Sequence, residues 1–68
     1  MKCYDKNGME IEVGNDVEVP ESYANGTDSW NNEFVGMVIE MDSVEGVVTV
    51  RDQDGNCFDI DSNRVELL

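Results

Sequence analysis

The sequence predicts an all-β fold in one small domain. Apolar and polar residues alternate in short runs, as in residues 9–13 and 48–51, which is typical of strands with one buried and one exposed face. Turn sequences such as Asn7-Gly8 and Asp54-Gly55 separate these runs. No segment keeps the spacing of an amphipathic helix. The chain has 68 residues, which is enough for one domain only.

The expected elements follow this alternation along the chain. Asn7-Gly8 predicts a hairpin between Tyr4-Asp5 and a strand over residues 9–13. Asp54-Gly55 predicts a second hairpin, and Asp61-Ser62-Asn63 predicts a single 3₁₀ turn, since these side chains bond nearby amides. Further strands are expected at residues 17–19, 34–41, 46–52, 56–61 and 65–67.

Segment 34–41 differs from the other strands because it is apolar in both registers. We therefore expect both of its faces to be largely sheltered, with Gly36 as a bend or bulge. By contrast, segment 20–33 is polar and irregular, and a loop of that length in a small domain is often functional. The expected core contains Ile11 or Val13, together with Val17, Val19, Val38, Val48, Val50, Phe58, Ile60, Val65 and Leu67.

The charge excludes several classes of function. The chain has 4 Lys and Arg, 16 Asp and Glu and no His, for a net charge of −12. Direct nucleic-acid binding is disfavoured, because affinity for phosphates comes mostly from Lys and Arg. No apolar run is long enough for a membrane span, and the first residues lack a signal-peptide core. We therefore expect a cytoplasmic location, with no membrane partner.

The order of the strands resembles that of an SH3-like small β-barrel with five strands. The resemblance covers roughly residues 11–68. Three sequence segments in this range are similar to those of the Tudor, Agenet and KOW branches of small barrels. It rests on Phe34-Val35-Gly36-Met37-Val38, on Gly46-Val47-Val48-Thr49-Val50 and on Asp52-Gln53-Asp54-Gly55. The resemblance implies a single domain over residues 1–68, with a prefix hairpin at 1–13 and the barrel at 14–68. It implies no particular activity, since small barrels have many functions.

The opening is similar to that of small phage-encoded proteins of the YopX type. The similar residues are Tyr4-Asp5-Lys6-Asn7-Gly8-Met9-Glu10-Ile11 and Gly14-Asn15-Asp16-Val17. This short resemblance implies a bacterial or phage source.

The first candidate site is an acidic face formed by Asp52, Asp54, Asp59 and Asp61, on or near one hairpin. One hypothesis is that it attracts a basic protein or peptide, because focused charge speeds association with Lys- or Arg-rich segments. A sharper version is mimicry of DNA, in which the carboxylates occupy the basic groove of a DNA-binding protein. The alternative is a structural or assembly subunit whose charge serves only solubility.

The second candidate site is an aromatic pocket formed by Tyr23, Trp30 and Phe34 near the long loop, with Phe58 beside it. Aromatic side chains hold proline-rich peptides or methylated amines in other small barrels. The alternative is that Phe34 and Phe58 are ordinary core residues and that Trp30 anchors the loop.

No metal site, cofactor or catalytic group is expected. The segment Asp52-Gln53-Asp54-Gly55-Asn56 lacks the glycine and glutamate spacing of a calcium loop. Cys3 and Cys57 have no CxxC spacing, and we expect plain thiols; the alternative is a disulfide between the prefix hairpin and the barrel. Without histidine the commonest general base is missing, so we expect a non-enzymatic protein. Its oligomeric state is open, with a monomer as the default.

Overall fold

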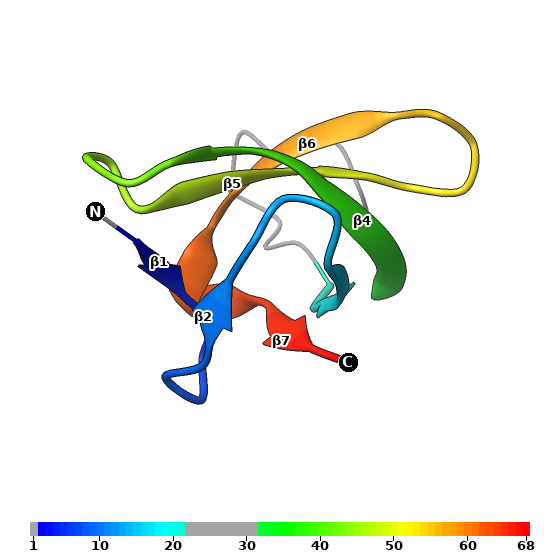
Figure 1. The fold of residues 1–68 in the computed structure, drawn as a ribbon. Coiled ribbons are helices and arrows are strands. Elements are labelled where there is room, and N and C mark those ends of the chain that lie inside the picture. Colours follow the sequence, from blue (N-terminus) through cyan, green and yellow to red (C-terminus); the bar gives the residue numbers. More distant parts are fainter. Residues whose placement is uncertain (1, 22–31) are drawn as a thin grey trace.

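The computed structural model describes residues 2–21 and 32–68, and these residues form an all-β protein (Figure 1). Strands β1 (Cys3–Tyr4) and β2 (Glu10–Ile11) pair as an N-terminal hairpin. A second sheet contains five antiparallel strands. These are β3 (Asp16–Val19), β4 (Phe34–Asp42), β5 (Val47–Arg51), β6 (Cys57–Asp61) and β7 (Glu66–Leu67), with the 3₁₀ turn η1 (Ser62–Arg64) before β7. In these residues no helix has the length and apolar character needed to cross a membrane.

The five-stranded sheet has the order β6-β5-β4-β3-β7, so β6 and β7 are its two edges. Over the described residues the hydrogen bonds therefore form an open sheet. The sequence predicted a barrel instead. Strands β4, β5 and β6 form one layer, with the turns at 43–46 and 52–56 at its opposite ends (Figure 1). The N-terminal hairpin and β7 lie on the other side of the core (Figure 1).

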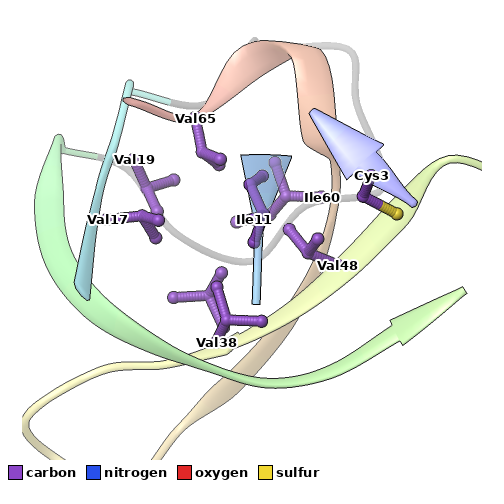
Figure 2. Close-up of a cluster of buried hydrophobic side chains, with 9 residues drawn as sticks. Cys3, Ile11, Val17, Val19, Val38, Val48, Ile60 and Val65 are labelled. Atoms are coloured by element: carbon purple, nitrogen blue, oxygen red, sulfur yellow. The ribbon is translucent and has the colours of Figure 1, made fainter. Parts of the chain in front are cut away.

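The core is a valine-rich cluster between these two sides, as the alternation predicts (Figure 2). Ile11 is the buried member of the expected pair, whereas Val13 is 58% exposed. Phe58 and Leu67 are half-buried and pack against the cluster. The buried members are Cys3, which the sequence did not indicate, and Ile11, Val17, Val19, Val38, Val48, Val50, Ile60 and Val65.

The expectation that both faces of segment 34–41 are sheltered is wrong. Val35 and Met37 are each 41% exposed, and Met41 is 38% exposed. The register of β4 against β5 shifts between Val38 and Glu40, which leaves Ile39 as a bulge. We expected the bulge at Gly36, but it lies three residues later, at Ile39.

Gly36 serves instead to bring β4 close to β5. A Cβ at Gly36 would lie 2.5 Å from Val50 Cγ1 and 2.7 Å from the carbonyl oxygen of Arg51. Since the second of these is backbone, the two strands are this close only because residue 36 has no side chain.

The two predicted Asx-Gly hairpins have the same hydrogen-bond pattern. In each, the first aspartate donates its N–H to the carbonyl four residues later, Asp5 to Met9 and Asp52 to Asn56, both at 2.8 Å. Its Oδ1 accepts from the N–H two and four residues later. Gly8 and Gly55 have φ of 80° and 88°, values that favour glycine.

Candidate functional site

The bulge at Ile39 decides which acidic side chains lie on the outer face of the sheet. Before the bulge, Gly36 and Val38 face the core, and continued alternation would turn Glu40 and Asp42 to the same side. The extra residue reverses the alternation, because a shift of one residue moves a strand's side chains to the other face. Glu40 and Asp42 are therefore exposed.

Strand register aligns these two residues with two acids of β6. Thr49 of β5 pairs with Glu40 on one side and with Asp59 on the other. Val47 pairs in the same way with Asp42 and with Asp61. Two strand spacings separate the β4 and β6 residues, or about 10 Å. We call the four carboxylates Glu40, Asp42, Asp59 and Asp61 the acidic sheet face.

Local hydrogen bonds orient two of these carboxylates. Asp59 Oδ1 accepts from Thr49 Oγ1 at 2.7 Å. Asp42 Oδ1 accepts from the N–H of Val44 at 3.0 Å and of Glu45 at 3.2 Å, which holds the β4–β5 turn. A shallow hollow in this surface is lined by Glu40, Asp42, Glu45, Thr49 and Asp59, among others. The hollow therefore has four carboxylates on its walls.

The positive side chains of the described residues lie mostly elsewhere. Lys2 Nζ is 3.2 Å from Glu10 Oε1, and Lys6 Nζ is 3.5 Å from Glu66 Oε1. The hydrogen bond and the charge of Glu10 raise the pKa of Lys2 above its ordinary value. No ion pair involves the acidic sheet face within the described residues. Its carboxylates therefore keep their charge exposed to solvent.

Arg51 marks one end of the acidic sheet face. It is the next outward residue of β5 after Thr49, and it pairs with Met37 of β4 and Cys57 of β6. Val47 and Thr49 thus each have a carboxylate residue on both sides. The next outward residue, Arg51, has none beside it and adds a guanidinium instead. A cationic group that extends from the carboxylates beyond Thr49 is therefore repelled by the positive charge of Arg51.

The structure divides the four acids that the sequence indicated. Asp59 and Asp61 lie on the acidic sheet face. Asp52 and Asp54 lie in the β5–β6 turn, at the opposite end of the layer from the β4–β5 turn (Figure 1). Asp52 is half-buried and accepts from the N–H groups of Asp54 and Asn56, so its carboxylate organises the turn.

Glu40 and Asp42 are the members of this site that sequence reasoning missed. The available signal was the pair of adjacent apolar residues, Val38-Ile39, followed by acids at alternate positions. Such a change of phase within one strand is what a bulge produces.

The aromatic candidates are only partly within the described residues. Phe34 and Phe58 are half-buried, with ring centroids 5.3 Å apart at an angle of 54°. Both pack against the core. Tyr23 and Trp30 lie outside the described residues, so the pocket stays a prediction.

The structure of residues 2–21 and 32–68 also bears on metal binding and on the two cysteines. No group of three or more His, Cys, Asp or Glu side chains within them is placed to hold a metal ion. Cys3 is buried, Cys57 is exposed, and both are free thiols. Cys3 Sγ lies 3.8 Å from the carbonyl oxygen of Asp42, which brings the hairpin against the end of β4.

Comparison of the chain with protein-family models, with curated proteins and with solved structures gave no match.

Proposed function

We propose that this chain is a non-enzymatic interaction module that binds a basic protein or peptide through its acidic sheet face. The observation that carries the proposal is the register of β4, β5 and β6. It places Glu40 and Asp42 opposite Asp59 and Asp61 across one central strand. No ion pair within the described residues neutralises them.

Electrostatics favours a cationic partner at this surface. The net charge of −12 produces a long-range attraction for Lys- and Arg-rich chains. Clustering on one rigid face adds a directional component, because complementary patches orient the encounter. The hollow between β4 and β6 provides a place where a long basic side chain can meet several carboxylates at once. The absence of histidine from the chain supports a non-enzymatic role.

For the fold we propose an SH3-like topology in a curled but unclosed sheet. Three features support it: the order β6-β5-β4-β3-β7, the long connection between β3 and β4, and the single 3₁₀ turn before β7. The long connection and the short turn before the last strand are also part of the chain order on which the resemblance rests, whereas the order of strands in the sheet comes from the structure.

Mimicry of DNA is a second candidate, favoured by the arrangement of the carboxylates in two parallel rows. Each row of the acidic sheet face contains two carboxylates, however, so the surface matches only a short stretch of a duplex. Mimicry requires that duplex DNA and this chain compete for one site on the partner. If the partner binds duplex DNA and this chain at the same time, mimicry is excluded, whereas the proposal of a basic partner still stands.

The proposal is tested with a synthetic Lys- and Arg-rich peptide as the probe. The double variant Glu40→Gln/Asp61→Asn removes two charges from the acidic sheet face. The matched control Glu12→Gln/Glu33→Gln removes two exposed charges outside this face. We expect the face variant to weaken binding about tenfold at low salt, with a change of about twofold or less for the control. Equal losses in both variants would show general charge attraction and contradict the proposal.

A further inference from the structure

The two edges of the five-stranded sheet differ in the state of their outward backbone groups. At the β7 edge, the N–H of Leu67 donates to Asp5 Oδ2 at 2.9 Å. The carbonyl of Val65, just before β7, accepts from the N–H of Lys6 at 2.9 Å. The turn of the N-terminal hairpin therefore occupies this edge.

At the β6 edge the outward groups have no partner among residues 2–21 and 32–68. The N–H of Asp52 donates to the carbonyl of Asn56, and the N–H of Ser62 donates to that of Gly46, both at 2.8 Å. Because antiparallel pairs alternate, the intervening hydrogen-bonded pairs include Phe58 and Ile60 of β6. The backbone groups of Cys57, Asp59 and Asp61 therefore point away from β5.

These outward groups are unsatisfied within the part of the chain that the structure describes. There, neither the N–H nor the carbonyl of Cys57 and Asp59 has a hydrogen-bond partner, and neither does the N–H of Asp61. An edge of this kind is a template for another strand.

The residues with open backbone groups also have the exposed side chains of β6. Cys57, Asp59 and Asp61 are all exposed, whereas Ile60 is buried. A residue of an added antiparallel strand that exchanges hydrogen bonds with Asp59 has its side chain on the same face as the Asp59 carboxylate. Cross-strand neighbours of opposite charge stabilise such a pair.

We propose that the free edge of β6 accepts an extended segment of another protein as an added antiparallel strand, with Lys or Arg at alternate positions opposite Asp59 and Asp61. This inference rests on the proposed function and gives the basic partner a conformation. Main-chain hydrogen bonds supply affinity in this mode of recognition, and the alternate side chains supply specificity.

Charge decides against a second copy of this chain as the occupant. Two β6 edges placed side by side would bring the aspartates of one copy against those of the other, and like charges opposite each other destabilise a sheet. The chain has no strand with alternating basic residues of its own, because its four cations are at positions 2, 6, 51 and 64. The occupant is therefore a basic strand from another protein.

The probe is a synthetic peptide of alternating Lys and Thr, long enough to cover the five residues of β6. Its control has the same composition with the lysines in one block. We expect the alternating peptide to bind about tenfold more tightly and to slow amide hydrogen exchange at Cys57 and Asp59. Equal affinity of the two peptides, with no added protection, would overturn the proposal.

N-methylated versions of the probe test the backbone contact directly. Methylation of the lysine amides removes the N–H groups that face β6 in an antiparallel pair, whereas the threonine amides point away. We expect about a tenfold loss, equal to about 1.4 kcal/mol, for the lysine set and about twofold or less for the threonine set. A loss for the threonine set alone would indicate a parallel strand and overturn the antiparallel arrangement. Tolerance of both sets would overturn strand addition altogether.

A protein variant tests the same edge without changing its charge. Cys57→Pro removes an outward N–H, and proline is tolerated on edge strands. We expect about a tenfold loss of peptide affinity for Cys57→Pro and an unchanged affinity for Cys57→Ser. If Cys57→Pro does not fold, the methylated peptides on the wild-type chain decide the question.

The outcomes separate this inference from the proposed function. If Glu40→Gln/Asp61→Asn weakens peptide binding but neither methylated set does, the basic partner stands and strand addition falls. If the face variant leaves binding unchanged, the proposed function falls, whatever the peptides show.

Discussion

Asp5 Oδ2 accepts a hydrogen bond from the backbone N–H of Leu67 at 2.9 Å, across 62 residues of sequence. The other oxygen of the same carboxylate accepts from the N–H groups of Asn7 and Met9 within the first hairpin turn. Asp5 is only 4% exposed. One side chain therefore joins the N-terminal hairpin to the last strand of the five-stranded sheet.

Asp5→Asn is expected to destabilise the protein more than Asp52→Asn. In both turns an asparagine oxygen can still accept the two local N–H groups, as aspartate does. At position 5, however, the new amide group would face the N–H of Leu67, so that two donors meet in a buried place. We expect a loss of about 2 kcal/mol for Asp5→Asn and about 0.5 kcal/mol or less for Asp52→Asn.

Urea unfolding at neutral pH measures both values. Equal losses would mean that the Leu67 contact adds nothing to the stability supplied by the turn.

The contribution of Asp5 is expected to depend on pH. Burial raises the pKa of Asp5, but the N–H groups of Leu67, Met9 and Asn7 and the charge of Lys6 outweigh burial, and the pKa lies below its ordinary value. The unfolded chain therefore binds this proton more readily, and stability from Asp5 is lost as pH falls through the lowered folded pKa.

The measurement is the difference in unfolding free energy between wild type and Asp5→Asn as a function of pH. This difference is expected to be complete above about pH 5 and to shrink below about pH 4. The comparison cancels the titration of the other carboxylates. A difference that stays constant into acid would contradict the assigned charge of Asp5.

Gly36→Ala is expected to destabilise the sheet by about 2–3 kcal/mol. The new methyl group would meet Val50 Cγ1 and the carbonyl oxygen of Arg51, at 2.5 and 2.7 Å. The carbonyl cannot retreat without disturbing the pairing of β4 with β5. Val35→Ala on the same strand is the control, with an expected loss of about 0.5–1 kcal/mol because Val35 is partly exposed. A Gly36→Ala variant as stable as this control would contradict the close approach.

Added salt is expected to raise the melting temperature. With a net charge of −12, the carboxylates repel one another in the folded state, and salt screens this repulsion. The effect should be smaller for Glu40→Gln/Asp61→Asn, which removes two carboxylates from one face. Thermal melts at low salt and at about 0.5 M sodium chloride measure both changes. A melting temperature that does not change with salt would contradict the role of self-repulsion.

Thiol reactivity is expected to distinguish the two cysteines. Cys57 is exposed on β6, whereas Cys3 is buried with Sγ near the carbonyl of Asp42. A thiol reagent should therefore modify one cysteine rapidly in the native protein and both in denaturant, because access limits the reaction. Mass spectrometry of the labelled peptides identifies the site. Rapid native labelling of Cys3 would contradict its burial and the docking of the hairpin.

Much of the fold could be predicted from local patterns in the sequence. Alternation identified β3, β5 and β6, with the buried valines of β3 and β5 and the buried Ile60 of β6, because side chains in a strand alternate with a period of two residues. Asn7-Gly8 and Asp54-Gly55 located two hairpins because glycine readily adopts the positive φ that these turns use. The 3₁₀ turn at Ser62–Arg64 lies where Asp61-Ser62-Asn63 predicted one. The bond that closes it is a backbone bond, from the N–H of Val65 to the carbonyl of Ser62, and the N-cap residue Asp61 makes no side-chain cap bond.

The sequence by itself determined the class of the fold, most of the core and an acidic surface. The tertiary structure decided which carboxylates share that surface. A bulge at Ile39 moved Glu40 and Asp42 to the outer face, and pairing with β5 aligned them with Asp59 and Asp61. The reason is that alternation is a local property, whereas register and bulges depend on the fit between two strands. The difference between the two sheet edges likewise follows from the tertiary structure: among the described residues the hairpin docks on β7 and no strand pairs with the outer edge of β6.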